Sequence, residues 1–407
     1  MKKNRKKDSD NSVEKPKATE KEYFLKYYRM AKKSAKYNSD KVILIRLDLI
    51  GDCTMFTDAV STVRKHFKDR EMTIVCLSVS KPIFERLGIF DNIITVDFRP
   101  LEINYEKLDV LIEKLREDEY DILLQPQVSK HPITDILAAA VKCNKRISME
   151  PQTDNSSKEW LRLTGSLYDE LIPYPKGVVS EFDYYGAFVR GLGIDYKTRC
   201  PRLKYGKQHF LEGNYFVIYP GGSFRQKFWD SSKLAKLVEH IYARTGFLCV
   251  ILGVESEKWI SEAVKKKLDV INAMSVADLT GCTSVSDVID IIGNAKFVVT
   301  NDTSGVHIAC ATRTPSVVIV GGWHYNRFLP YHIEDVRPED KLPMVANTPM
   351  PCYNCDWTWS IIGKRNPNCL KRMQCEKTSE CIDKISYSQV QKLVDELIQK
   401  ENFVTKN

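Results

Sequence analysis

The stretch KVILIRLDLIGD, residues 41–52, decides the fold. Its first half, Val42–Leu47, is an almost unbroken apolar run with the length of one buried strand. Asp48, Leu49 and Ile50 follow, and Gly51 and Asp52 lead into a helical stretch that extends to about Phe67. A buried strand followed directly by a helix is the repeating unit of parallel α/β layers, so we expect an α/β protein.

The same unit recurs on both sides of a connection expected at residues 204–214. Short apolar runs separated by helical stretches predict strands at Val42–Leu47, Thr73–Leu77, Ile93–Val96, Ile122–Leu124, Tyr215–Tyr219, Leu248–Leu252, Phe297–Thr300 and Ser316–Val320. Residues 151–205 are less regular, and a helix is expected at about 386–401. Two such halves predict two Rossmann-like domains facing across a cleft. The expected divisions are residues 1–40, 41–205, 206–340 and 341–407.

Most of the net charge lies in the N-terminal tail. The chain has 61 basic and 53 acidic residues, and residues 1–40 hold 13 basic against 6 acidic ones. The rest of the chain is therefore close to neutral, which argues against a nucleic-acid-binding core. No apolar run approaches the ~20 residues of a membrane span, and MKKNRKK is not followed by the apolar region of a signal peptide. We expect a cytoplasmic protein.

Residues 23–37 have the pattern of an amphipathic helix. Phe24, Tyr27 and Tyr28 fall on one face, with lysines and arginines around the rest. Two interpretations remain open: a helix docked on the first domain, or a helix resting on the anionic inner face of a membrane.

Three loops after expected strands carry residues suited to chemistry. In the first loop, which also holds Asp48, Gly51 would allow a tight turn and Asp52 is placed as a general base; a helix N-cap is the alternative for Asp52. In the second, YPGGSFRQKFW (219–229), two glycines, Ser223, Arg225 and Lys227 suit a diphosphate, although an ordinary solvated loop has similar composition.

The third loop, TNDTSGVH (300–307), opens a helix. The small residues Thr303, Ser304 and Gly305 would leave N–H groups free at a helix N-terminus, where an anion is favoured. Asp302 would accept hydrogen bonds from sugar hydroxyls, and His307 is expected to be a buried histidine with its hydrogen bonds satisfied.

Several common motifs are missing from the sequence. It has no Walker A loop, no G-x-G-x-x-G fingerprint and no H-E-x-x-H pair, and its one D-x-D, at Asp8–Asp10, lies in the tail. Kinase, dehydrogenase, zincin and metal-dependent transferase functions are therefore disfavoured.

Taken together, the loops resemble the family 9 glycosyltransferases, which include the ADP-heptose:lipopolysaccharide heptosyltransferases. The resemblance runs from about Val42 to the C-terminal helix. It rests on IRLxxIGD (45–52), YPGGS…KxW (219–229), and LTGCTSVSDV…NDTSGVHIACA (279–311) leading into PSVVIVG (315–321).

The resemblance implies a GT-B fold and an inverting, metal-independent transferase. Residues 41–205 would be the acceptor domain and residues 206–340 the nucleotide-sugar domain, with ADP-heptose the first donor to consider and a lipopolysaccharide-type or other lipid-linked glycan as acceptor. It assigns Asp52 as general base, Lys227 to the diphosphate and Asp302 to the sugar. Glu255 would hold the ribose, with Glu257 as a rival, and the backbone at Thr303–Gly305 would bind phosphate.

This chain departs from the family pattern at two places. Asp302-Thr303-Ser304-Gly305 stands where the family usually has D-[S/T]-G-P, and Phe56-Thr57-Asp58 where it usually has T-T-P. Both loops border the expected cleft, so the sugar or the acceptor can differ from heptose and the lipopolysaccharide core.

Two further questions stay open from the sequence. Cys352, Cys355, Cys369, Cys375 and Cys381 begin with one zinc-like C-x2-C pair and continue with irregular spacing, so structural zinc and reduced thiols both fit. Other functions also share the expected fold: a nucleotide-sugar epimerase or hydrolase that needs no acceptor, and a non-catalytic, membrane-associated protein that binds sugar nucleotides.

Overall fold

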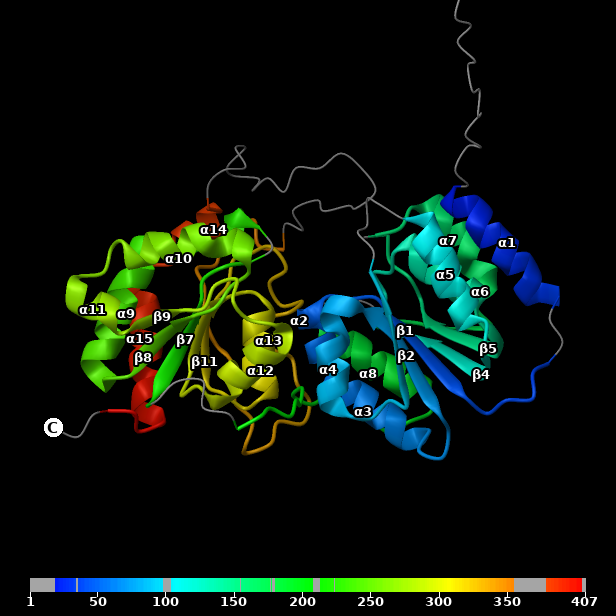
Figure 1. Cartoon of the computed structure of the whole chain (residues 1–407), viewed down its shortest axis with the longest axis horizontal. Coiled ribbons are helices and arrows are strands. Elements are labelled where there is room, and N and C mark those ends of the chain that lie inside the picture. Colours follow the sequence, from blue (N-terminus) through cyan, green and yellow to red (C-terminus); the bar gives the residue numbers. More distant parts are fainter. Residues whose placement is uncertain are drawn as a thin grey trace, which may run out of the picture.

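The computed structural model describes residues 19–33, 36–97, 104–153, 155–175, 177, 180–207, 213–222, 224–354 and 378–404, and within them it contains two six-stranded parallel sheets. The sheets lie side by side, each with its own helices (Figure 1). The basic tail (1–18), Ser223, Cys355, Cys369 and Cys375 lie outside the described residues.

The first sheet has the strand order β3-β2-β1-β4-β5-β6. Its strands are β1 Val42–Arg46, β2 Met72–Leu77, β3 Asn92–Val96, β4 Glu119–Gln125, β5 Lys142–Met149 and β6 Glu170–Ile172. The helices of this domain are α2 Ile50–Met55, α3 Thr57–His66, α4 Lys81–Leu87, α5 Tyr105–Leu115, α6 Pro132–Ala140, α7 Lys158–Thr164 and α8 Glu181–Gly191.

The second sheet has the order β12-β11-β10-β7-β8-β9. Its strands are β7 Tyr215–Tyr219, β8 Leu248–Ile251, β9 Val276–Asp278, β10 Val298–Asn301, β11 Ser316–Ile319 and β12 Met344–Ala346. The helices around it are α9 Ser231–Thr245, α10 Lys258–Lys265, α11 Val270–Met274, α12 Val285–Asn294, α13 Ser304–Ala311, α14 Glu380–Asp383 and α15 Tyr387–Lys400.

Both sheets therefore have the Rossmann order 3-2-1-4-5-6 when each is numbered from its own first strand. The chain reverses direction across the sheet between β1 and β4 in the first, and between β7 and β10 in the second. Ligands of such sheets bind beyond the carboxyl ends of the strands at this reversal. The three loops singled out in the sequence follow β1, β7 and β10, so all three lie at the expected positions.

The N-terminal helix α1 (Glu20–Lys33) is part of the first domain. Phe24 and Tyr27 are buried, and the Phe24 ring centre lies 5.5 Å from that of Trp160. The hydroxyl of Tyr23 donates a hydrogen bond to Asp109 at 2.8 Å. The docked helix is thus confirmed, on the side of the domain away from the second sheet (Figure 1). In the described part of the chain, no helix is both long and apolar enough to cross a membrane.

The two domains meet through polar and close-packed contacts. Arg86 of α4 forms an ion pair with Asp290 of α12 at 2.6 Å, and the same carboxylate accepts a hydrogen bond from Gly206 N at 2.6 Å. Helices α2 and α13 are in contact at the junction and lie between the two sheets (Figure 1). This junction brings the loop after β1 next to the loop after β10. The exact domain boundaries at residues 40, 205 and 340 remain a prediction.

Candidate active site

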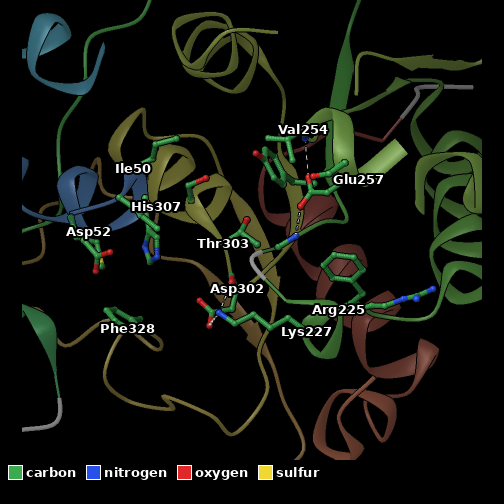
Figure 2. Close-up of a pocket in the computed structure, with 18 of the residues that line it drawn as sticks. Ile50, Asp52, Arg225, Lys227, Val254, Glu257, Asp302, Thr303, His307 and Phe328 are labelled. Carbon is green, nitrogen blue, oxygen red and sulfur yellow. Dashed lines mark hydrogen bonds and ion pairs between the residues drawn. The ribbon is translucent and has the colours of Figure 1, made fainter. Parts of the chain in front are cut away.

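A cavity of ≈ 630 Å³ lies between the domains, and residues of all three predicted loops line it. Figure 2 shows Asp52 and Phe328 at one end, Val254 and Glu257 at the other, and Thr303 between them. The lining residues are Leu49, Ile50, Gly51, Asp52 and Met55 from the first domain, and Tyr219, Gly222, Arg225, Lys227, Phe228, Val254, Ser256, Glu257, Trp259, Asp302, Thr303, Ser304, His307 and Phe328 from the second.

Asp52 lies in the first turn of α2 and lines the cavity. The N-cap of α2 is Leu49, and no side chain caps this helix, so the capping interpretation of Asp52 is wrong. Burial, together with the nearby charges of Asp48 and Glu181, raises the pKa of Asp52 to about 7, although Arg46 and Arg327 oppose the rise. A carboxylate with a pKa near neutrality suits a general base.

Beneath α2, Arg46 is a buried cation that joins several groups near Asp52. Its Nη2 lies 2.9 Å from the Asp48 carboxylate and donates to the Asp52 carbonyl oxygen at 3.3 Å and to the Tyr185 hydroxyl at 3.0 Å. The guanidinium also lies over the Phe56 ring, 4.2 Å from its centre. Asp48 does not line the cavity. Instead it pairs with Arg46, which in turn donates to the Asp52 carbonyl oxygen.

Gly51 has a different role from the tight turn expected of it. It lies within α2 at a φ that any residue can adopt, so the turn does not require glycine. A Cβ at this position would lie 3.1 Å from Cδ2 of His307 on α13. Gly51 therefore allows the two domains to approach closely beside Asp52.

His307 is buried, and its Nδ1 is 2.7 Å from the hydroxyl of Tyr331. Burial lowers the pKa of His307 to about 4 despite the opposing charge of Asp302. The expectation of a buried, hydrogen-bonded histidine is confirmed, and its ring is neutral at pH 7.

Lys227 and Asp302 form an ion pair in the cavity at 3.3 Å. Lys227 Nζ also donates to the Asp302 carbonyl oxygen at 3.2 Å and lies 4.4 Å from the centre of the Trp323 ring. Burial would raise the pKa of Asp302, but Lys227 and His307 outweigh it and lower the pKa overall. The carboxylate is thus ionised beside a cation, in position to accept hydrogen bonds.

The N-terminus of α13 opens into the same space, with Thr303 as its N-cap (Figure 2). Asn301, the last residue of β10, donates from Nδ2 to the carbonyl oxygens of Pro220 and Gly221. The loops after β7 and β10 are therefore fastened to each other. Gly222, Thr303 and Ser304 line the cavity, while Gly305 is buried against Tyr219.

Glu255 and Glu257 occupy different places. Glu257 is buried and lines the cavity; its Oε1 accepts from Gly222 N at 2.7 Å and its Oε2 from Val254 N at 2.9 Å. Glu255 does not line the cavity. Its side chain is 71% exposed and pairs with Lys258 at 2.8 Å.

Arg225 borders the cavity, but its guanidinium points away from Asp302 and Thr303 (Figure 2). It lies 4.3 Å from the centre of the Trp259 ring, which stacks on Phe228 at 5.4 Å. These two aromatic rings and Phe328 also line the cavity, and sequence reasoning did not single them out. Trp259 carried a usable signal, because it follows Glu257 by two positions and lies in the first turn of α10.

The described residues contain no cluster of three or more histidine, cysteine or acidic side chains that could hold a metal ion. Of the cysteine-rich segment, Cys352 is partly exposed, and the buried Cys381 sulfur accepts a hydrogen bond from Gly322 N at 3.3 Å. Because the other three cysteines lie outside the described residues, the zinc hypothesis stays a prediction.

Known proteins resemble the chain in sequence. The sequence model of glycosyltransferase family 9 (heptosyltransferase) matches residues 110–337, more than half of the chain. Lipooligosaccharide heptosyltransferase 2 of Haemophilus influenzae is 30% identical over 154 residues, which are 37% of this chain and 44% of that protein. Lipopolysaccharide heptosyltransferase 3 of Escherichia coli is 20% identical over 294 residues, covering 69% and 83%.

Solved structures resemble it in fold. The E. coli ADP-heptose LPS heptosyltransferase II superposes with a TM-score of 0.67 at 15% identity, covering 89% of this chain and 99% of that one. A family 9 glycosyl transferase from Veillonella parvula gives the same score and identity, covering 90% and 100%. The expected fold, two Rossmann-like domains in the GT-B arrangement, is confirmed.

Proposed function

Because the chain belongs to glycosyltransferase family 9, we propose that it moves heptose or a related sugar from a nucleotide-sugar donor to a lipopolysaccharide core or another cell-envelope glycan. We propose further that transfer inverts the anomeric carbon and needs no catalytic metal, with ADP-heptose as the first donor to test. One observation carries this proposal: Asp52 of the first domain lines the same cavity as Lys227 and Asp302 of the second.

In the proposed reaction, an acceptor hydroxyl lies against Asp52. Its oxygen attacks the anomeric carbon of the donor from the face opposite the nucleoside diphosphate, and its proton passes to the Asp52 carboxylate. The bond between the anomeric carbon and the phosphate oxygen breaks, and its electron pair leaves with the diphosphate. The raised pKa of Asp52 supports this role, because it brings the carboxylate close to the operating pH.

The departing diphosphate would be stabilised by groups of the second domain. Lys227 supplies a cation, and the N-terminus of α13 at Thr303–Gly305 supplies N–H groups and a favourable dipole. Arg225 and Ser223 complete the proposed diphosphate loop. Since Lys227 is paired with Asp302 in this structure, we propose that an incoming diphosphate takes over Lys227 and leaves Asp302 to accept hydrogen bonds from sugar hydroxyls.

For the donor ribose we favour Glu257 over Glu255. Glu257 lines the cavity, and each of its oxygens accepts one backbone N–H, which leaves each a further lone pair for a hydroxyl. Glu255 is solvent-exposed and outside the cavity. The reaction is expected in the cytoplasm, with the basic tail able to contact the anionic inner face of the inner membrane.

The proposal is tested by separating donor binding from turnover. Thermal stabilisation with a panel of nucleotide sugars identifies the donor, because a ligand at 100 times its Kd adds ~2.7 kcal/mol. Asp52→Asn should keep this stabilisation while its transfer rate falls by ~10²–10⁴-fold. Lys227→Ala should lose stabilisation and rate together, since a hydrogen bond to a charged group contributes ~1.5–3 kcal/mol.

Three outcomes would count against the proposal. Asp52→Asn retaining more than about a tenth of the wild-type rate would remove Asp52 as the base. Consumption of donor at an equal rate with and without acceptor would favour an epimerase or hydrolase. Failure of every nucleotide sugar and nucleoside diphosphate to stabilise the folded protein would favour a different activity.

A further inference from the structure

After β11 the chain crosses from the second domain to the first. We call residues 323–337 the crossing segment. Along it, Arg327 O accepts a hydrogen bond from Glu181 N at 2.8 Å, and Asp335 N donates to Thr198 O at 3.0 Å. Between these points the ring of Tyr331 packs on that of Phe182, with centres 4.7 Å apart. A segment of the donor domain is therefore held along α8 of the acceptor domain.

This segment places a cation next to Phe328, which lines the cavity. Arg327 Nε lies 3.2 Å from the Glu181 carboxylate, and Nη2 donates to Ser129 Oγ at 3.0 Å. The pair is largely shielded, with exposed side-chain fractions of 21% and 10%. Phe328, the next residue in the chain, lies at the same end of the cavity as Asp52 (Figure 2).

We propose that Arg327 and Glu181 are positioning residues that act through Asp52, with the Arg327 guanidinium favouring the ionised base and the Glu181 carboxylate opposing it. This proposal rests on the proposed function of Asp52. Glu181 lies one turn before Tyr185 on α8, and the Tyr185 hydroxyl donates to the Asp52 carbonyl oxygen at 3.3 Å. Arg327 pairs with Glu181 from the crossing segment, which follows β11 of the second domain.

The charges around Asp52 support this assignment. The ionisable groups that face it from its own helix and from the elements packed against it are Arg46, Asp48, Cys53, Glu181, Tyr185, His307 and Arg327. Arg46 and Asp48 form a fixed pair within the first domain. Arg327 is the cation on the crossing segment, and burial lowers the pKa of His307 to about 4. Lys227 and Asp302 of the second domain line the same cavity as Asp52, but they form an ion pair whose charges offset each other.

Substitutions of Arg327 and Glu181 should shift the pKa of Asp52 in opposite directions. Removing the guanidinium takes away a charge that favours ionised Asp52, so Arg327→Met should raise the pKa of Asp52. Removing the carboxylate takes away a charge that opposes ionisation, so Glu181→Gln should lower it. A charge within ~4–6 Å typically shifts a neighbouring carboxyl by ~1–3 pKa units, and we expect about one unit in each direction.

The experiment measures the pKa of Asp52 without any substrate. Thermal unfolding is recorded from about pH 4 to pH 9 for wild type, Arg327→Met and Glu181→Gln, each with and without Asp52→Asn. The Tm gained through Asp52→Asn grows with pH until Asp52 is fully ionised in the folded protein, so the pH at which the gain levels off reports its pKa. That pH should rise with Arg327→Met, fall with Glu181→Gln, and stay near wild type with Arg327→Lys.

Arg190→Gln provides the matched control. Arg190 and Glu334 form another ion pair between α8 and the crossing segment, at 3.3 Å, with both side chains more than 40% exposed. Breaking this ion pair loosens the contact between α8 and the crossing segment without changing the charges that face Asp52. The pH at which the Tm gain levels off should therefore stay at its wild-type value. Shifts of the same sign in both test variants, no shift in either, or an equal shift in Arg190→Gln would overturn the inference. Because activity is not measured, the result stands apart from the turnover test of Asp52→Asn.

Discussion

Replacing the carboxylate of Asp52 by an amide should stabilise the protein, and by more as the pH rises. The folded-state pKa of Asp52 is raised from 3.8 to about 7, chiefly by burial. The folded protein therefore holds a proton on Asp52 between these two values, and the unfolded chain does not. Stability is lost as pH increases through this window, because the folded state must then ionise a buried acid. Asp52→Asn removes that cost and leaves the side-chain shape almost unchanged.

The size of the effect follows from the shift. About 3 pKa units at 1.36 kcal/mol each set a ceiling of roughly 4 kcal/mol for the cost of the ionised group. Roughly 3 kcal/mol of this develops between about pH 5 and pH 7, and no more is added above the folded-state pKa. For a domain of 150–250 residues, this corresponds to a Tm gain of at most about 6–12 °C for Asp52→Asn at pH 8 over its value at pH 5. Calorimetry of both proteins at the two pH values measures it.

Asp195→Asn is the control for this experiment. Asp195 is exposed, so the same exchange of carboxylate for amide removes a solvated charge and should change Tm equally at both pH values. If the gain from Asp52→Asn were as large at pH 5 as at pH 8, burial would not be raising the pKa of Asp52, and the argument for a base poised near neutrality would fail.

Other positions give predictions that use the same purified protein. Glu257→Gln should weaken nucleoside diphosphate binding in calorimetric titration, because it alters the carboxylate that accepts from Gly222 N and Val254 N. Glu255→Gln should leave binding unchanged. A larger loss of affinity with Glu255→Gln than with Glu257→Gln would restore Glu255 as the ribose contact. Gly51→Ala places a methyl group 3.1 Å from a ring carbon of α13, and we expect it to cost ~1 kcal/mol or more of stability and to lower the transfer rate more than donor affinity. Phe24→Ala should destabilise the protein by ~3–5 kcal/mol without any lipid present, while Lys32→Ala on the exposed side of α1 should not; a negligible loss for Phe24→Ala would mean that the helix is docked only loosely.

The sequence predicted the fold and the site best at the ends of three strands, where each strand is followed by a loop of the cavity. The runs at β1, β7 and β10 are mostly apolar because each of these strands is central and almost completely buried. Their ends are marked by glycine or by Asn301-Asp302. Since these are the strands at which each sheet reverses direction, the loops that were easiest to recognise are also the loops that form the cavity.

The strands that the sequence did not predict, β5, β6, β9 and β12, lie at or next to a sheet edge. Residues Lys142–Met149 form β5, but the sequence KCNKRISM mixes three cations into the strand, and Arg146 is buried only because its Nε and Nη2 donate to main-chain carbonyls of Ala138 and Val141. The strands β6, β9 and β12 have three residues each, too few for a periodic pattern. Local sequence could not identify them, because neighbouring strands and helices decide their conformation.

Contacts between the domains were beyond sequence reasoning for a different reason. Arg327 and Glu181 are separated by 146 positions, and no local pattern relates an arginine after β11 to a glutamate at the start of α8. The same holds for Gly51, whose small size matters only because His307 lies opposite. A residue chosen for what faces it across a domain junction has no signature in its own neighbourhood.

The residues that line the candidate active site are divided between the two domains. Asp52 belongs to one domain, and the cations expected to meet the diphosphate belong to the other, so neither domain alone holds all the groups of the proposed reaction. While no diphosphate is bound, Lys227 is neutralised by Asp302, and Asp52 holds its proton up to about pH 7. In the proposed reaction the incoming diphosphate would free Asp302 by taking over Lys227, while Asp52, whose pKa already includes the charge of Arg327, ionises as the pH passes about 7. The rate of the proposed transfer should therefore rise with pH through this range.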